Sequence, residues 1–137
     1  LGNWCMQQGI NPQELVDWFD RLFIDGHPWV MAANVIGMSQ YADGGKIATK
    51  PYVSSGSYIN KMSNYCSSCQ YNVKERLGPN ACPFNSLYWN FLDDKKQKLA
   101  KNQRMRMMYS VLNKFSSEEV HKMKLRASEI MGNPENY

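Results

Sequence analysis

Three cysteines at fixed spacing constrain this chain more than any other feature of its sequence. They are arranged as Cys66-x2-Cys69-x12-Cys82, and Pro83 follows the last one directly. Thiolates separated by two residues share one tight loop and can reach the same ion or cluster face. The spacing therefore predicts a metal centre or an iron–sulfur cluster. Such a centre needs four ligands, and the fourth cysteine, Cys5, lies far upstream.

Length and composition are those of a single globular domain. The chain has 137 residues, of which 43% are hydrophobic and 20% charged, so it can bury a core. No stretch approaches the roughly 20 apolar residues of a membrane helix, and the first residues do not resemble a signal peptide. We therefore predict a cytoplasmic protein without membrane contact. Its cysteines should be reduced, because disulfides are typical of exported proteins.

Positive charge is concentrated toward the end of the chain. The net charge is +4, and ten Lys or Arg residues between Lys95 and Arg126 face two acidic residues, Glu118 and Glu119. A block of this kind is usually a solvated helical face, and it can also contact the phosphates of a nucleic acid. On charge alone we prefer the solvated face.

Helix signals recur along the chain, and no long alternating strand pattern appears. Asn11-Pro12-Gln13-Glu14 is typical of a helix start, and the apolar spacing predicts a helix to Ile24 that packs Trp18 and Phe19 inward. A short buried helix is expected from Trp29 to Ile36. Further starts are expected at Ser57, at Asn85 or Ser86, and at Ser116 with a capping box to Glu119. The fold class is therefore all-α with long ordered loops.

Two shorter segments complete the prediction. Residues 42–45 (Ala-Asp-Gly-Gly) are typical of a turn. Residues 1–6 have the apolar content of a helix but no start signal before it. We therefore expect the chain to be a fragment of a larger protein.

The segment 29–71, which includes Cys66-Ser-Ser-Cys69, closely resembles the iron–sulfur bacterial cryptochrome and photolyase group, the prokaryotic (6-4) photolyases. The likeness extends from Leu1 past Ala81-Cys82-Pro83-Phe84 and weakens toward the C-terminus. It implies that residues 1–137 are a C-terminal fragment of the helical domain that holds FAD and an iron–sulfur cluster and receives damaged DNA.

The resemblance also implies a role for each cysteine. Cys66, Cys69 and Cys82 match three of the four ligands of a [4Fe-4S] cluster, and the remaining ligand falls before Leu1. Cys5 is then an ordinary buried apolar residue.

Other residues match cofactor and substrate positions of the family. Asn34 falls beside the flavin N5, and Trp18 matches a tryptophan of the electron relay, whereas Phe19 stands where relatives often carry tyrosine. Positions that line the lesion pocket correspond to Met38, Tyr52 and Tyr58, where aromatic rings can replace the stacking that a flipped base loses. The histidines of the chain, His27 and His121, match neither catalytic histidine of the family.

Two functional hypotheses follow. The first is a light-driven DNA repair flavoprotein or its cryptochrome-like photoreceptor variant. As a photolyase-type lyase, its partners are UV-damaged DNA and the missing N-terminal part of its own chain. The present chain alone should then neither bind FAD tightly nor repair DNA, and its uncovered apolar surface should favour self-association. The second is a zinc-stabilised module that binds nucleic acid, with Cys5, Cys66, Cys69 and Cys82 as zinc ligands.

Overall fold

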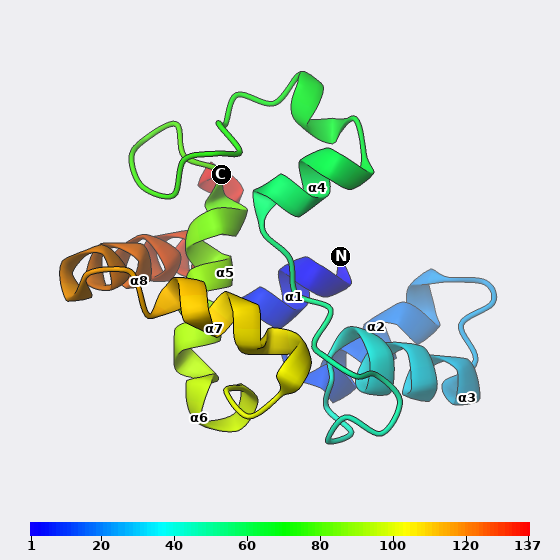
Figure 1. Ribbon diagram of the computed structural model, residues 1–137. Helices are drawn as coiled ribbons and strands as arrows, with labels where there is room; N and C mark the ends of the chain where they lie inside the picture. The colour runs from blue at the N-terminus through cyan, green and yellow to red at the C-terminus, as the bar shows by residue number, and fades with distance from the viewer. The chain divides into compact units, whose positions relative to one another are not determined.

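The computed structural model describes residues 1–137 as an all-α chain, which confirms the predicted fold class (Figure 1). It contains no strand, and the only sheet-like pairing is an isolated bridge between Asn72 and Ala81. Two compact units follow one another, Leu1–Val53 and Ser54–Tyr137. None of the helices has the length and apolar character needed to cross a membrane.

The first unit consists of three α-helices and a π-helix: α1 (Gly2–Gln8), α2 (Pro12–Leu22), α3 (Pro28–Met31) and η1 (Ala32–Ser39). Helix α2 begins as predicted, since the Asn11 side chain accepts a hydrogen bond of 2.9 Å from the main-chain N–H of Gln13. It ends at Leu22 rather than Ile24, because Phe23 adopts an extended conformation.

The core of the first unit is built on one face of α2. Leu15 and Val16 are buried with Met31 and Val35, and Phe19 packs against this cluster. Trp18 is 45% exposed, so the prediction that it packs inward is wrong. Successive side chains of an α-helix are about 100° apart around its axis. Leu15, Val16 and Phe19 therefore point to one side of α2, and Trp18 points to the flank of that side.

The predicted helix from Trp29 to Ile36 is split between two helix types. Four residues of α-helix, which begin at Pro28, pass directly into the π-helix η1. The wider turn of η1 is closed by the N–H of Gln40, which donates to the carbonyl of Val35 at 2.8 Å. Trp29 is 71% exposed, which contradicts the expected burial at this end.

The predicted turn at residues 42–45 is confirmed. The carboxylate of Asp43 accepts hydrogen bonds of 2.9 Å from the main-chain N–H groups of Gly45 and Ile47. Gly44 and Gly45 have φ values of 76° and 81°, a region that glycine enters at little cost.

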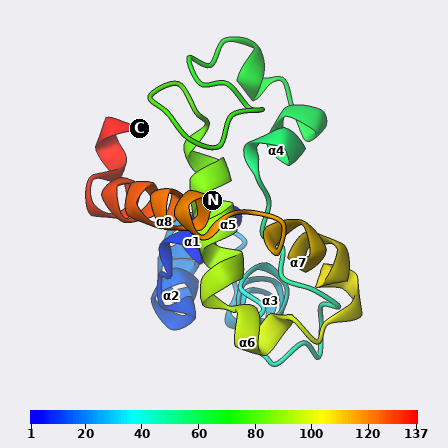
Figure 2. The ribbon, with the colours of Figure 1, turned by 60° about the vertical axis from the view of Figure 1, so that its left-hand side comes forward.

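The second unit, Ser54–Tyr137, is larger than the first and consists of helices joined by loops. Its helices are α4 (Gly56–Met62), the 3₁₀ turn η2 (Tyr65–Ser67), α5 (Pro83–Asp94), α6 (Lys96–Leu99), η3 (Gln103–Met105), α7 (Arg106–Leu112), α8 (Ser117–Gly132) and η4 (Pro134–Asn136). Helix α8 lies across α5, as Figure 2 shows. The segment between α4 and α5 carries three of the cysteines, Cys66, Cys69 and Cys82 (Figure 1).

Helices α5 and α8 form the core of the second unit. Leu87 and Leu92 of α5 and Met123 and Ile130 of α8 are at most 1% exposed. The predicted capping box at Ser116 is present: the Ser116 hydroxyl accepts from the N–H of Glu119, and the Glu119 carboxylate accepts from the N–H of Ser116. Ala127 is buried as predicted, and Val120 and Met131 are half-buried.

Two predicted helix caps are wrong in position. Helix α4 begins at Gly56 with Ser55 before it, and the hydroxyl of Ser57 donates to the distant carbonyl of Val73. Helix α5 begins at Pro83, ahead of the expected Asn85 or Ser86. Proline has the φ value and the missing N–H that suit a first helical position, so the helix starts there.

The basic block is largely a solvated surface. Lys124 and Lys122 form ion pairs of 2.6 Å with Asp93 and Glu118, and Lys96 donates to the side chain of Asn113. Exposed pairs of this kind contribute little stability, but they reduce the positive electrostatic potential that would attract a phosphate.

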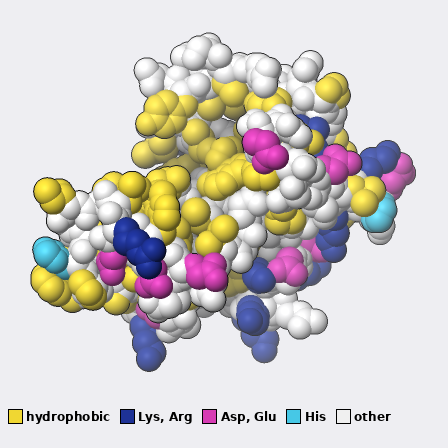
Figure 3. Space-filling model, turned by 180° about the vertical axis from the view of Figure 1, so that it is seen from behind, with side chains coloured by type: hydrophobic (Ala, Val, Ile, Leu, Met, Phe, Trp, Pro, Cys, Tyr) yellow, Lys and Arg dark blue, Asp and Glu magenta, His cyan; other side chains and the backbone are white.

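Hydrophobic side chains also reach the surface on the face drawn in Figure 3.

Candidate functional site

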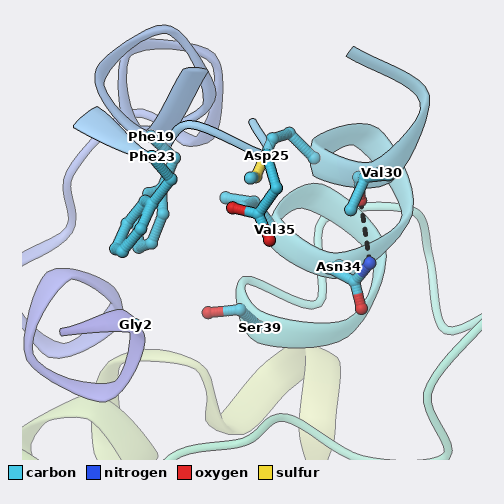
Figure 4. Close-up of a pocket in the computed structure, with 9 residues that line it drawn as sticks. Gly2, Phe19, Phe23, Asp25, Val30, Asn34, Val35 and Ser39 are labelled. Atoms are coloured by element: carbon cyan, nitrogen blue, oxygen red, sulfur yellow. Dashed lines mark hydrogen bonds between the residues drawn. The ribbon is translucent and has the colours of Figure 1, made fainter. Parts of the chain in front are cut away.

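The first unit contains an open pocket of about 360 Å³ between α2, the loop after it, and the α3–η1 segment. Phe19 and Phe23 form one wall, with ring centroids 5.2 Å apart and planes 18° from parallel. Figure 4 shows the polar groups of Asp25, Asn34 and Ser39 around the same space. The pocket thus combines an aromatic wall with a few hydrogen-bonding groups, as small-molecule sites commonly do.

Asn34 lines this pocket from the π-helix. Its side-chain N–H donates to the carbonyl of Val30 at 2.9 Å, one turn earlier (Figure 4). The residue is exposed, so the apolar run around it does not bury its amide. A π-helical turn changes the angle between successive side chains, and such turns are frequent at functional sites. The role of Asn34 beside a flavin stays a prediction.

Trp18 does not line the pocket but connects with its aromatic wall. Its ring meets that of Phe19 edge-to-face, with centroids 5.3 Å apart and an interplanar angle of 84°. Phe19 in turn stacks on Phe23, so three rings lie in sequence from the exposed flank of α2 to the pocket. The role of Trp18 in an electron relay stays a prediction.

The three residues predicted to line a lesion pocket occupy different surroundings. Met38 is half-buried in η1, whereas Tyr52 and Tyr58 are 51% and 55% exposed. Exposed aromatic rings are suitable platforms for a base, and the pocket described above does not include them. Their assignment stays a prediction.

The cysteines of the second unit differ in exposure. Cys82 is buried, Cys66 is half-buried and Cys69 is exposed, and all three are free thiols. Burial raises the pKa of Cys82, hydrogen bonds from nearby main-chain N–H groups oppose that increase, and the charges of Cys66 and Cys69 add to it. Burial is thus the main reason why the Cys82 thiol holds its proton.

The structure does not bring these three thiols together as a metal-binding site. No group of three or more His, Cys, Asp or Glu side chains is placed to hold a metal ion. The donor types themselves suit a cluster or a zinc ion, since thiolates are common ligands of both. The structure therefore does not confirm the predicted convergence of the three sulfurs.

Cys5 belongs to the core of the first unit. It packs against the cluster formed by Leu15, Val16, Met31 and Val35. Burial raises its pKa, which keeps it a neutral thiol. This environment suits the interpretation of Cys5 as an ordinary apolar residue.

The sequence of the chain is similar to those of two known proteins. No family model matches it. Over 130 residues, or 95% of the chain, it is 45% identical to a (6-4) photolyase of Agrobacterium fabrum. This chain belongs to the photolyase-related group. It spans 26% of the length of that photolyase. A second relative, an uncharacterized protein of Acanthamoeba polyphaga mimivirus, is 38% identical over 66% of the chain and 63% of its own length.

Two polar residues of this photolyase-related chain, Asn85 and Ser86, have structural roles that the sequence does not predict. The sequence predicts a helix cap at Asn85 or Ser86, but both residues are buried in the first turn of α5. Asn85 bonds to three main-chain groups, and the hydroxyl of Ser86 donates to the carbonyl of Arg76 at 2.8 Å. The available signal was a pair of polar residues at the start of an otherwise apolar helix. Such residues require partners when they are buried.

Proposed function

We propose that this chain is part of a light-driven DNA repair flavoprotein of the photolyase type. The observation that carries the proposal is the 45% identity to a (6-4) photolyase over 95% of the chain. In this proposal the whole protein binds UV-damaged DNA in the cytoplasm, and the remainder of the photolyase-type chain completes the flavin and lesion sites.

FAD is the proposed cofactor of the whole protein, and the pocket of the first unit fits a part of it. Its aromatic wall offers a surface on which a flat ring can stack, while Asn34, Asp25 and Ser39 offer polar groups around the same space. Bound FAD supplies the light-driven electron transfer. Asn34 would contact the flavin after leaving its bond to Val30, and Trp18 would connect the site to the surface through Phe19.

The lesion side of the proposal rests on Met38, Tyr52 and Tyr58. An extruded base loses its stacking partners, and an aromatic ring replaces that stacking without regard to sequence. The exposure of both tyrosines leaves their faces available for such a contact. Their phenol groups can also donate hydrogen bonds to carbonyl groups of a base.

A [4Fe-4S] cluster is the proposed occupant of the cysteine site, with Cys66, Cys69 and Cys82 as ligands. The Cys66-x2-Cys69-x12-Cys82 spacing supports this assignment. The zinc-module hypothesis needs Cys5 as the fourth ligand, and Cys5 packs within the apolar core of the first unit. We therefore do not propose the zinc module.

An exchange experiment tests the proposal directly. The matching 130-residue stretch of the Agrobacterium photolyase is replaced by this chain, and light-dependent repair of DNA carrying (6-4) lesions is measured. We expect FAD binding, iron content and repair to be retained. Cys66→Ser should lower the iron content, whereas Cys5→Ser should leave it unchanged. A folded, FAD-containing exchange protein without repair would contradict the proposed function.

A complementary measurement concerns the chain alone. FAD is titrated into the purified 137-residue protein and followed by fluorescence. We expect no tight binding, because one open pocket covers only a small part of such a ligand. Sub-micromolar, saturable binding by a monomer would show that the chain holds a complete flavin site.

A further inference from the structure

Asn85 is a buried polar residue that the proposed chemistry does not use. It is 4% exposed and stands on the first turn of α5, shortly after Cys82. Its amide oxygen accepts from the N–H of Gly56 at 3.0 Å. Its amide nitrogen donates to the carbonyls of Val73 at 3.0 Å and Glu75 at 2.6 Å. One side chain thus connects the start of α5 to two other segments of the second unit, the start of α4 and residues 73–75.

Gly56 lies against the sulfur of Cys82. A Cβ atom added to Gly56 would stand 2.5 Å from Sγ of Cys82 and 3.1 Å from its Cβ. Only a residue without a side chain allows the start of α4 to come this close. The N–H of the same glycine donates to Asn85, so one contact sets the distance between α4 and the Cys82 thiol.

The main chain before Cys82 is also held by tertiary contacts. The N–H of Cys82 donates to the carbonyl of Asn72 at 3.1 Å, and the N–H of Asn72 donates to the carbonyl of Asn80 at 2.6 Å. The guanidinium of Arg126, on α8, donates to the carbonyl of Ala81 at 2.8 Å. Cys82 is therefore fixed from several directions.

The segment that carries Cys66 and Cys69 is held differently. Its hydrogen bonds join residues no more than four positions apart, such as the N–H of Cys69 to the carbonyl of Cys66 and the N–H of Ser67 to the carbonyl of Asn64. Local bonds of this kind set the shape of the segment but not its direction from Cys82. The two halves of the cysteine site thus differ in how firmly the fold holds them.

We propose that Gly56 and Asn85 are positioning residues of the cysteine site. They hold Cys82 as its preformed ligand, and the segment with Cys66 and Cys69 closes onto it when the centre is loaded. This inference rests on the proposed function, because it takes the three cysteines to be ligands of one centre. Groups that orient a ligand without touching the metal typically change metal affinity about 10- to 100-fold when they are removed.

Titration of Co²⁺ into the reduced 137-residue chain tests this role without reference to repair. The thiolate-to-cobalt charge-transfer absorption reports cysteine coordination, and far-UV circular dichroism reports the helices. We expect Asn85→Ala to weaken Co²⁺ binding by about tenfold or more with its helix content kept. The matched control is Asn90→Ala, a half-buried position on the same helix, which should bind Co²⁺ like the unaltered chain.

Gly56→Ala is the second variant. Alanine favours the helix but places a methyl group against Cys82, so Co²⁺ binding should weaken while α4 persists. If Asn85→Ala unfolds, Gly56→Ala decides the question alone. Unchanged affinity in the folded variants would overturn the positioning role.

The variant Cys82→Ser distinguishes failure of the positioning role from failure of the proposed cluster site. A Cys82→Ser chain with the unaltered affinity and absorption would show that Cys82 is no ligand, and the proposed cluster site would fail. If Cys82→Ser loses the absorption while Gly56→Ala and Asn85→Ala keep full affinity, the cluster site stands and the positioning role is wrong. Absence of Co²⁺ binding by the unaltered chain would contradict both.

Discussion

The hydroxyl of Tyr109 on α7 donates a buried hydrogen bond of 3.1 Å to the carbonyl of Leu92 near the end of α5. The last four carbonyls of an α-helix have no partner within the helix. Tyr109, which is 5% exposed, thus satisfies one of these groups from a different helix. The bond connects α5 and α7 where water has little access.

Replacement of Tyr109 by phenylalanine should therefore destabilise the chain. The ring is kept but the carbonyl of Leu92 loses its partner, which typically costs about 1 to 3 kcal/mol. Urea unfolding of Tyr109→Phe measures the loss in the free energy of unfolding. Tyr65→Phe, at a position 77% exposed, is the control and should leave that free energy unchanged. Equal stability of the two variants would show that the bond contributes nothing.

Alkaline pH should destabilise the chain over a defined range. Burial, with a contribution from Tyr109, raises the pKa of Tyr88 to about 12, and burial with Asp93 raises the pKa of Tyr109 to about 12. In the unfolded chain both phenols lose their protons near pH 10. The folded state therefore binds more protons between these values, so stability is full below pH 10 and falls as pH rises toward 12.

Tyrosinate absorbance and circular dichroism, recorded together along an alkaline titration, check this prediction. We expect two of the eight tyrosines to ionise late and together with loss of helix. Complete tyrosinate formation before any loss of helix would contradict it.

The four thiols should react with a disulfide reagent at different rates at neutral pH. Cys69 is exposed and should react first, followed by the half-buried Cys66. Cys5 and Cys82 should react at least about tenfold more slowly than Cys69, because burial raises the pKa of each and lowers the thiolate fraction. Mass spectrometry of quenched samples gives the order. Reaction of Cys82 as fast as that of Cys69 would contradict its burial.

Local signals in the sequence determined the helical character of the protein. The Asn11 cap, the capping box at Ser116 and the turn at residues 42–45 each depend on side chains that bond to main chain within four residues. Such interactions are complete within a short segment, so their pattern predicts the structure without knowledge of the rest of the fold.

Tertiary structure alone decided which face of α2 is buried and what the polar residues of α5 do. Trp18 and Phe19 are neighbours in an apolar pattern, and only packing against Met31 and Val35 selected Phe19 for the core. Asn85 bonds to Gly56, 29 positions earlier, and no local pattern predicts that contact. The cysteine spacing likewise gives the donor types but not their directions. A buried polar group takes the partner that folding brings close, because its desolvation must be compensated wherever that partner lies in the sequence.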